Sequence, residues 1–142
     1  MGRTILGAVA GLVMAFITIM LIEFAGLKVY PPPPGLNPMV TEDMATILTE
    51  MPLGAMLSVI VAWVAGAFDG GMVAALIAGR NRPRVAAIVP ALMVIAGVAG
   101  IILQLPQHPV LMSVAGLLLP IPAALAGAAL AGVMRKPSAS AS

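Results

Sequence analysis

Two acidic side chains inside long apolar runs are the groups of this sequence best suited to chemistry. Asp69 lies in the run 52–79, and Glu23 lies near the end of the run 4–29. A carboxyl group away from water is costly unless it is hydrogen-bonded, holds a cation or carries a proton. We therefore take Asp69 and Glu23 as candidates for a proton, ion or substrate path, with helix packing as the alternative for each residue.

His108 is the only histidine of the chain, and it lies in a short uncharged turn that also contains Pro106 and Pro109. Because an imidazole changes its charge between about pH 5 and 8, His108 is a candidate pH sensor. An ordinary interfacial role is the alternative. Cysteine is absent, and there is neither a second histidine nor a glycine-rich phosphate loop. Without these groups we expect no catalysis, no metal and no cofactor.

The composition is typical of a membrane protein. Of the 142 residues, 61% are hydrophobic and 8% are charged, and the mean hydropathy is +1.13, whereas about 25% of the residues of a soluble domain are charged. No soluble core could absorb this much apolar surface. The formal net charge is only +2, and most basic residues lie at the ends of apolar runs. Their placement indicates membrane orientation and does not favour nucleic-acid binding.

Four stretches are long and apolar enough to cross a bilayer as helices. We predict an all-α integral membrane protein, a bundle of four transmembrane helices within a single domain at 1–136. The predicted spans are 4–29, 52–79, 85–103 and 110–134. Pro90, Pro120 and Pro122 should kink the spans that contain them. Residues 137–142 are small and polar, which predicts a disordered tail.

The loop 30–51 between the first two spans contains two predicted elements. The prolines from Pro31 to Pro34 prevent helix formation and predict a stiff polyproline II spacer. Thr41 can cap a short helix that ends near Glu50, whose apolar side chains repeat at helical spacing on one face. We expect this external amphipathic helix to lie on the membrane surface or to cover the mouth of the bundle.

Small residues recur three or four positions apart along every predicted span, so each helix has a face that can approach a neighbour closely. Asp69 lies on such a face, and Trp63 points elsewhere, to pack or to line a site. As packing partners for the Asp69 carboxyl we expect Ser58, Gln104, Ser113 or a carbonyl freed near Pro90 or Pro120. The glycines with a predicted helix-packing role are Gly7, Gly11, Gly66, Gly70, Gly97, Gly100, Gly116 and Gly127.

The distribution of basic residues predicts how the chain is oriented. With four spans, Arg3, the turn 80–84 and the pair Arg135 and Lys136 fall on one side, and Lys28 falls on the other. Basic residues accumulate on the cytoplasmic side of membrane proteins. The prediction is a multi-pass protein of the cell inner membrane with both termini and the turn 80–84 in the cytoplasm.

Two functions stay open on this basis. The first is a structural, accessory or assembly component of the membrane, favoured by small-residue faces on every helix. Because four such faces exceed what one bundle needs, we expect a homo-oligomer or another membrane protein as partner, besides the lipid bilayer. The alternative is an oligomeric proton-linked transporter or channel that uses Asp69, with or without Glu23 as a second proton-binding group.

Overall fold

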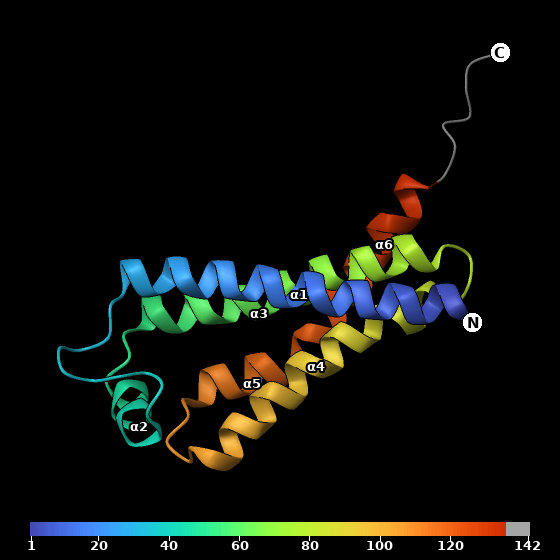
Figure 1. The fold of residues 1–142 in the computed structure, drawn as a ribbon. Coiled ribbons are helices and arrows are strands. Elements are labelled where there is room, and N and C mark those ends of the chain that lie inside the picture. The colour runs from blue at the N-terminus through green and yellow to red at the C-terminus, as the bar shows by residue number, and fades with distance from the viewer. Residues whose placement is uncertain (136–142) are drawn as a thin grey trace.

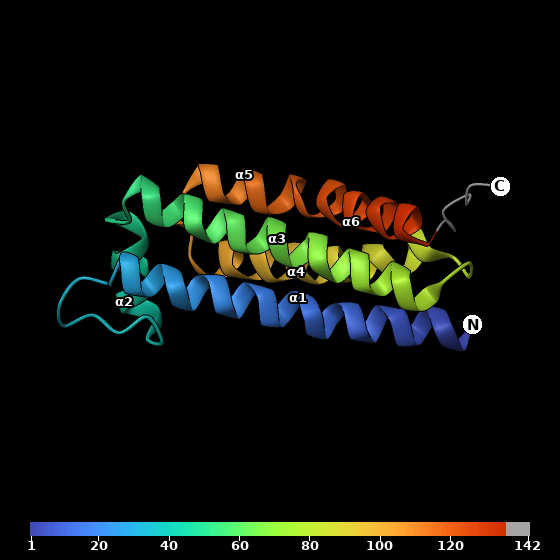
Figure 2. The ribbon, with the colours of Figure 1, turned by 90° about the horizontal axis from the view of Figure 1, so that it is seen from above.

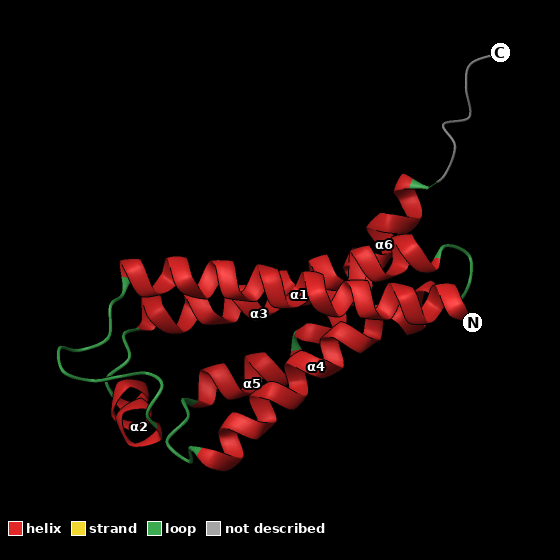
Figure 3. Ribbon diagram, viewed as in Figure 1, coloured by secondary structure: helices red, strands yellow, loops and turns green. Residues whose placement is uncertain are grey.

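The computed structural model describes residues 1–135, and within this range the chain is all-helical (Figures 1 and 3). The helices are α1 (Gly2–Val29), α2 (Thr41–Thr49), α3 (Leu53–Ala78), α4 (Pro83–Gln104), α5 (Val110–Leu118) and α6 (Pro120–Met134). Four helical stretches are long and apolar enough to cross a membrane, namely α1, α3, α4 and α5 together with α6. This confirms the predicted all-helical chain with four apolar helices of spanning length. The predicted tail 137–142 lies outside the described residues.

Prolines set several of the helix boundaries. Helix α1 ends at Val29, just before the proline run, and Pro52 occupies the cap position before α3. Pro83 lies in the first turn of α4, where a missing N–H group costs nothing. The predicted fourth span is divided at Leu119, because Pro120 has no N–H group to continue the hydrogen-bond ladder. Leu119 keeps helical dihedral angles, so α6 follows α5 without a loop, and the two helices bend relative to each other at this point (Figure 1).

The short helix α2 begins one residue earlier than predicted. Val40 is its cap residue and Thr41 is already helical, so the predicted capping role of Thr41 is wrong. Asp43 supplies the local hydrogen bond instead, since its Oδ2 accepts the backbone N–H of Asn37 at 2.9 Å. This bond anchors the preceding loop to the first turn of α2, while Leu48 on the opposite face is buried.

Helix α3 is the central element, and α1 lies antiparallel beside it (Figures 1 and 2). In the second view, α5 and α6 follow the other side of α3, and α4 runs behind. The N-terminus, the turn between α3 and α4 and the end of α6 lie at one end of the bundle. Helix α2 and the loop between α4 and α5 lie at the opposite end. We call these the basic end and the α2 end.

Two hydrogen bonds tie the first turn of α1 to the last turn of α3 and the turn that follows it. Arg3 Nε donates to the carbonyl oxygen of Ile77 at 3.2 Å, and Thr4 Oγ1 donates to that of Asn81 at 2.8 Å. Both join residues far apart in the sequence. They fix the basic end of α1 against α3.

The interface between α1 and α3 is so close that glycine is required at several positions. A Cβ atom at Gly11 would lie 2.5 Å from the carbonyl oxygen of Gly70, and one at Gly7 would lie 2.5 Å from that of Ala74. A Cβ at Gly66 would lie 2.9 Å from the oxygen of Ala15. Since these neighbours are backbone atoms, a side chain could be admitted only if the helices moved apart.

The remaining glycines on the predicted packing faces divide into two groups. A Cβ at Gly127 would strike the carbonyl oxygen of Phe68 on α3, and a Cβ at Gly116 would lie 2.7 Å from the Trp63 ring. Gly97 and Gly100 differ from this pattern, because a Cβ at either would meet no atom within 4 Å. Within residues 1–135, no helix therefore packs closely on α4 at these two glycines.

Candidate functional site

Asp69 is hydrogen-bonded across the interface between α1 and α3. Thr18 Oγ1 donates to Asp69 Oδ2 at 3.1 Å, and both side chains are partly buried. The partners expected from the sequence for this carboxyl did not include Thr18, although Thr18 lies on the small-residue face of α1. The hydrogen-bond partner of Asp69 in the structure is therefore Thr18, and not Ser58, Gln104, Ser113 or a freed carbonyl.

The backbone around Asp69 is among the most closely packed of the molecule. Gly70 follows it in the sequence, and a Cβ there would lie 2.7 Å from the carbonyl oxygen of Gly11. The next residue, Gly71, faces α6 so closely that a Cβ would strike the backbone of Ala124. The two glycines thus bring helices onto both sides of α3 at the level of Asp69. The Asp69 carboxyl can accept hydrogen bonds in this setting, and Thr18 supplies one.

Glu23 has different neighbours and is not part of the same site. Its half-buried carboxyl lies near the Trp63 indole group. Trp63 itself is buried, with 7% of its surface exposed, in an apolar cluster formed with Ile60, Val98 and other residues. An indole N–H is a donor only, so a carboxylate is a suitable acceptor for it.

His108 also lies beside the Trp63 ring. The two rings are stacked, with centroids 6.3 Å apart and planes inclined by 14°. The loop that carries His108 is fixed locally, because its backbone N–H donates to the carbonyl oxygen of Leu105 at 3.0 Å. Glu23, Trp63 and His108 therefore form a contiguous series from α1 through α3 to the loop between α4 and α5. The sequence singled out each residue separately but contained no signal that they meet.

The hydrogen bonds of His108 assign its tautomer. Ser113 Oγ donates to the carbonyl oxygen of Pro109 at 3.1 Å, and it lies 2.7 Å from His108 Nδ1. A hydroxyl group has a single hydrogen to donate. Since that hydrogen goes to Pro109, we assign the imidazole proton to Nδ1 and the free lone pair to Nε2. Ser113 was expected as a partner of Asp69, but it is hydrogen-bonded to His108 instead.

Burial lowers the pKa of His108 below its ordinary value, because the charged imidazolium loses hydration in this loop. A hydrogen bond with the backbone of Pro109 opposes the shift, but desolvation is the larger effect. Only 7% of the His108 surface is exposed. The neutral imidazole is therefore the form that this packing favours.

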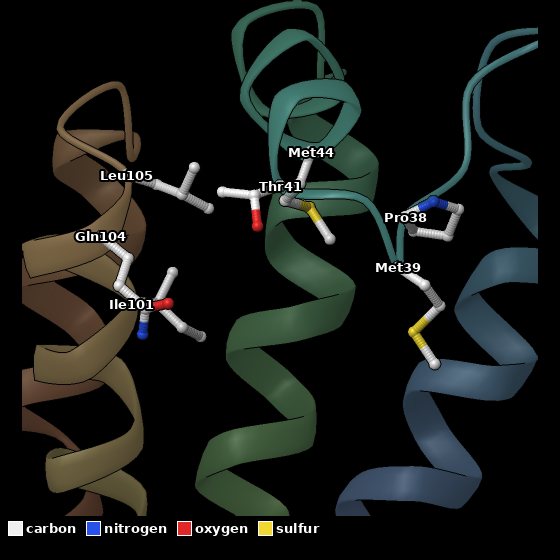
Figure 4. Close-up of a pocket in the computed structure, with 7 residues that line it drawn as sticks. All are labelled: Pro38, Met39, Thr41, Met44, Ile101, Gln104 and Leu105. Atoms are coloured by element: carbon white, nitrogen blue, oxygen red, sulfur yellow. The ribbon is translucent and has the colours of Figure 1, made fainter.

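A small hollow lies beside this loop at the α2 end (Figure 4). Its volume is about 120 Å³, and side chains of α2 and of the loop before it face the last turn of α4 across it. Gln104 supplies a polar group to its wall, and the neighbouring Leu105 carries the carbonyl that binds the His108 backbone. The hollow is too small for more than a few water molecules or a small ion.

No protein-family model, no curated protein and no solved structure matches this chain. The fold and the contacts described above define residues 1–135 as an all-helical chain with four apolar helices long enough to span a membrane.

Proposed function

We propose that this chain is a small multi-pass integral membrane protein that acts as a structural or accessory component of the cell membrane, without catalytic activity. The observation that carries the proposal is the hydrogen bond between Thr18 and Asp69 within the glycine-packed interface of α1 and α3. A carboxyl group placed there links two helices. Its cost in an apolar medium is offset by the bond and by the close packing that accompanies it.

The orientation that we propose follows from the charges at the two ends. Arg3, Arg82, Arg84 and Arg135 belong to the basic end, which we place in the cytoplasm together with both termini. Helix α2 and the loop 30–51 are then external. In this arrangement α2 covers the outer mouth of the bundle as an amphipathic helix.

An accessory role requires a surface for another helix, and the uncovered face of α4 suits it. Gly97 and Gly100 lie on this face with open space where their side chains would be. In a bilayer, helices associate where small residues let their backbones approach. We assign this face to contact with a second copy of the chain or with another membrane protein.

Cysteine accessibility tests the proposal in this naturally cysteine-free chain. Ser58, Ala62 and Ala65 precede Asp69 on the same face of α3 and are replaced one at a time by cysteine. A membrane-impermeant thiol reagent added from outside is expected to leave all three unlabelled in intact vesicles. Cysteine in place of Met39, which is 90% exposed in the external loop, is the labelled control. Labelling of these positions down to Ala65 would overturn the accessory role in favour of transport.

A proton-linked transporter or channel is the second candidate, and one observation favours it. Glu23, Trp63, His108 and Ser113 form a continuous polar and aromatic series from α1 to α5 at the α2 end. Asp69 would be the proton-binding group farther from the α2 end on this path. Asp69→Asn keeps the shape and the hydrogen-bonding capacity but removes titration. Under this second function the variant inserts normally and loses proton flux in reconstituted vesicles, whereas under the accessory role it behaves as the wild type.

A further inference from the structure

A groove at the basic end combines charge and apolar surface in a way that suits one class of ligand. It lies between the first turn of α4 and the second half of α6 and has a volume of about 590 Å³. Arg84 and Arg135 line it at its charged end, and Leu125, Ala129, Gly132 and Val133 line the rest. We infer that this groove binds one anionic phospholipid of the cytoplasmic leaflet, with its phosphate at the two arginines and an acyl chain along α6.

The length of the groove fits one leaflet. Leu125 and Arg135 are ten residues apart in the sequence, which corresponds to about 15 Å along a helix at 1.5 Å per residue. The hydrocarbon core of a bilayer is about 30 Å thick, so one leaflet accounts for half of it. A lipid whose phosphate lies at Arg135 would therefore reach Leu125 near the middle of the bilayer. This step rests on the proposed membrane insertion and orientation.

The chemistry of the charged end favours a phosphodiester. Guanidinium groups bind phosphate oxygens through two parallel hydrogen bonds, and two arginines from different helices can hold one phosphate between them. Arg135 Nε donates to the carbonyl oxygen of Ala131 at 3.3 Å, which fixes the base of the guanidinium and leaves its Nη groups for a ligand. The first turn of α4 adds N–H groups at the positive end of a helix dipole.

The surroundings select an anionic headgroup. Arg3 lies close by, since a Cβ at Gly79 would be 3.5 Å from the Arg3 guanidinium and 3.8 Å from that of Arg135. No acidic residue of the chain belongs to this end. Asp69, the acid closest to Gly79 in the sequence, lies ten residues earlier, about 15 Å along α3. A zwitterionic headgroup would place its cation among these arginines, whereas phosphatidylglycerol brings no cation.

The floor of the groove provides the seat for the acyl chain. A Cβ at Gly132 would meet no atom within 4 Å, so the space beside this residue is open. A leucine at this position can be accommodated by the fold but fills the groove. The charge and the cavity can therefore be removed by separate substitutions. This distinguishes a specific lipid site from the general attraction of anionic lipids to basic residues.

The test measures lipid binding by the purified full-length protein with native mass spectrometry, using phosphatidylglycerol and phosphatidylcholine as probes. The wild type is expected to bind one phosphatidylglycerol in preference to phosphatidylcholine. The double variant Arg84→Gln, Arg135→Gln is expected to lose about tenfold or more of this affinity. Gly132→Leu should lower it with all arginines present, because the acyl chain loses its place.

Matched controls remove the same charge and add the same bulk elsewhere. Arg80→Gln with Arg82→Gln removes two charges from the same end without touching the groove lining, and Ala126→Leu adds a side chain at an exposed position of α6 outside it. Both controls are expected to bind phosphatidylglycerol within about twofold of the wild type. Circular dichroism of each variant establishes that it is folded.

Several results would overturn the inference. If both arginine double variants lost the same affinity for phosphatidylglycerol, binding would depend only on the general charge of this end. An unchanged affinity of Gly132→Leu would show that no acyl chain lies beside Gly132. Equal binding of phosphatidylcholine would remove the headgroup preference. A chain that inserts into vesicles but shows any of these results contradicts only the lipid site, whereas failure to insert contradicts the proposed function as well.

Discussion

The imidazole of His108 lies stacked on the indole of Trp63, with a separation of 6.3 Å between the ring centroids. This contact joins the loop between α4 and α5 to the centre of α3. A hydrogen bond of 2.7 Å between Nδ1 and Ser113 Oγ holds the imidazole in this position. The stacked pair and the contact with Ser113 therefore hold the loop between α4 and α5 against α3.

Acidification is expected to destabilise the folded protein at this contact. Burial lowers the pKa of His108 in the folded protein, while in the unfolded chain the group titrates near its ordinary value of about 6.5. Below that value the unfolded state binds a proton that the folded state resists. The stability is therefore full above about pH 6.5, falls as the pH drops toward the lowered folded pKa and levels off below it. Thermal unfolding in detergent between pH 8 and pH 5 measures the effect.

His108→Gln isolates the contribution of the imidazole to that pH dependence. Glutamine keeps a polar side chain of similar length but has no proton to exchange in this range. The variant should show a flatter dependence of the unfolding temperature on pH than the wild type, and the difference between the two curves belongs to His108. Glu23 beside Trp63 is present in both proteins. Identical curves would show that His108 does not cause the pH dependence of the unfolding temperature.

Loss of the interhelical hydrogen bond at Asp69 should destabilise the bundle. Thr18→Val removes the hydroxyl donor at nearly constant volume and is expected to cost about 1–2 kcal/mol of unfolding free energy. Thr18→Ser should retain most of the stability. Thr4→Val makes the same change at the exposed basic end, where the loss should stay below about 1 kcal/mol. Equal costs at Thr4 and Thr18 would contradict the structural role given to Asp69.

Alanine should have opposite effects at two glycines. At Gly11 the new methyl group would lie 2.5 Å from a backbone oxygen of α3, and such overpacking costs about 1–3 kcal/mol. At Gly97 the methyl group enters open space, and alanine is the better helix former by up to about 1 kcal/mol. Denaturant titrations in the same detergent compare the two variants. Destabilisation of similar size at both positions would disagree with this helix arrangement.

The uncovered face of α4 at Gly97 and Gly100 is predicted to mediate association with another chain. Gly97→Leu should preserve the fold of a single chain but block the approach of another helix to α4, so cross-linked dimers or a copurified partner should be lost. Ala25→Leu, at an exposed position of α1, is the control and should leave association unchanged. A wild-type protein that is strictly monomeric and copurifies with nothing would rule out this use of the face.

Reporter fusions test the membrane orientation. A reporter at Ser142 should be cytoplasmic, and one inserted near Pro34 should be external, because an odd number of spans separates the two points. Reporters on one side would contradict the four-span topology. The measurement is independent of any function assigned to Asp69 or His108.

The helix positions were predictable because their determinants are local. Run length, apolar composition and the prolines before α3 and after α1 act within a few residues, and the predicted spans agree with the helices to within a few residues at each end. The cap of α2 was misplaced because Asp43 bonds back to Asn37 and Thr41 becomes helical. That choice depends on the path of the whole loop and is not encoded by one residue type.

The side-chain partners could not be predicted, since they depend on which helices are neighbours and in which register. Periodicity places Gly97 and Gly11 equally on small-residue faces, but it does not say which face another helix covers. Asp69 had several candidate donors on other spans, and the register of α1 on α3 selected Thr18. The stacking of Trp63 and His108 likewise requires the loop after α4 to fold back over α3.

The bonds from Arg3 to Ile77 and from Thr4 to Asn81 have a consequence for biosynthesis. Every residue that joins α1 to α3 has been synthesised once the ribosome has passed Asn81, before α4 has been made. The first two spans can therefore close into a hairpin during translation, with their glycine contacts already in register. Helices α4, α5 and α6 are then added to a finished template, so a defect at Gly11 or Gly70 should act at the earliest stage of assembly.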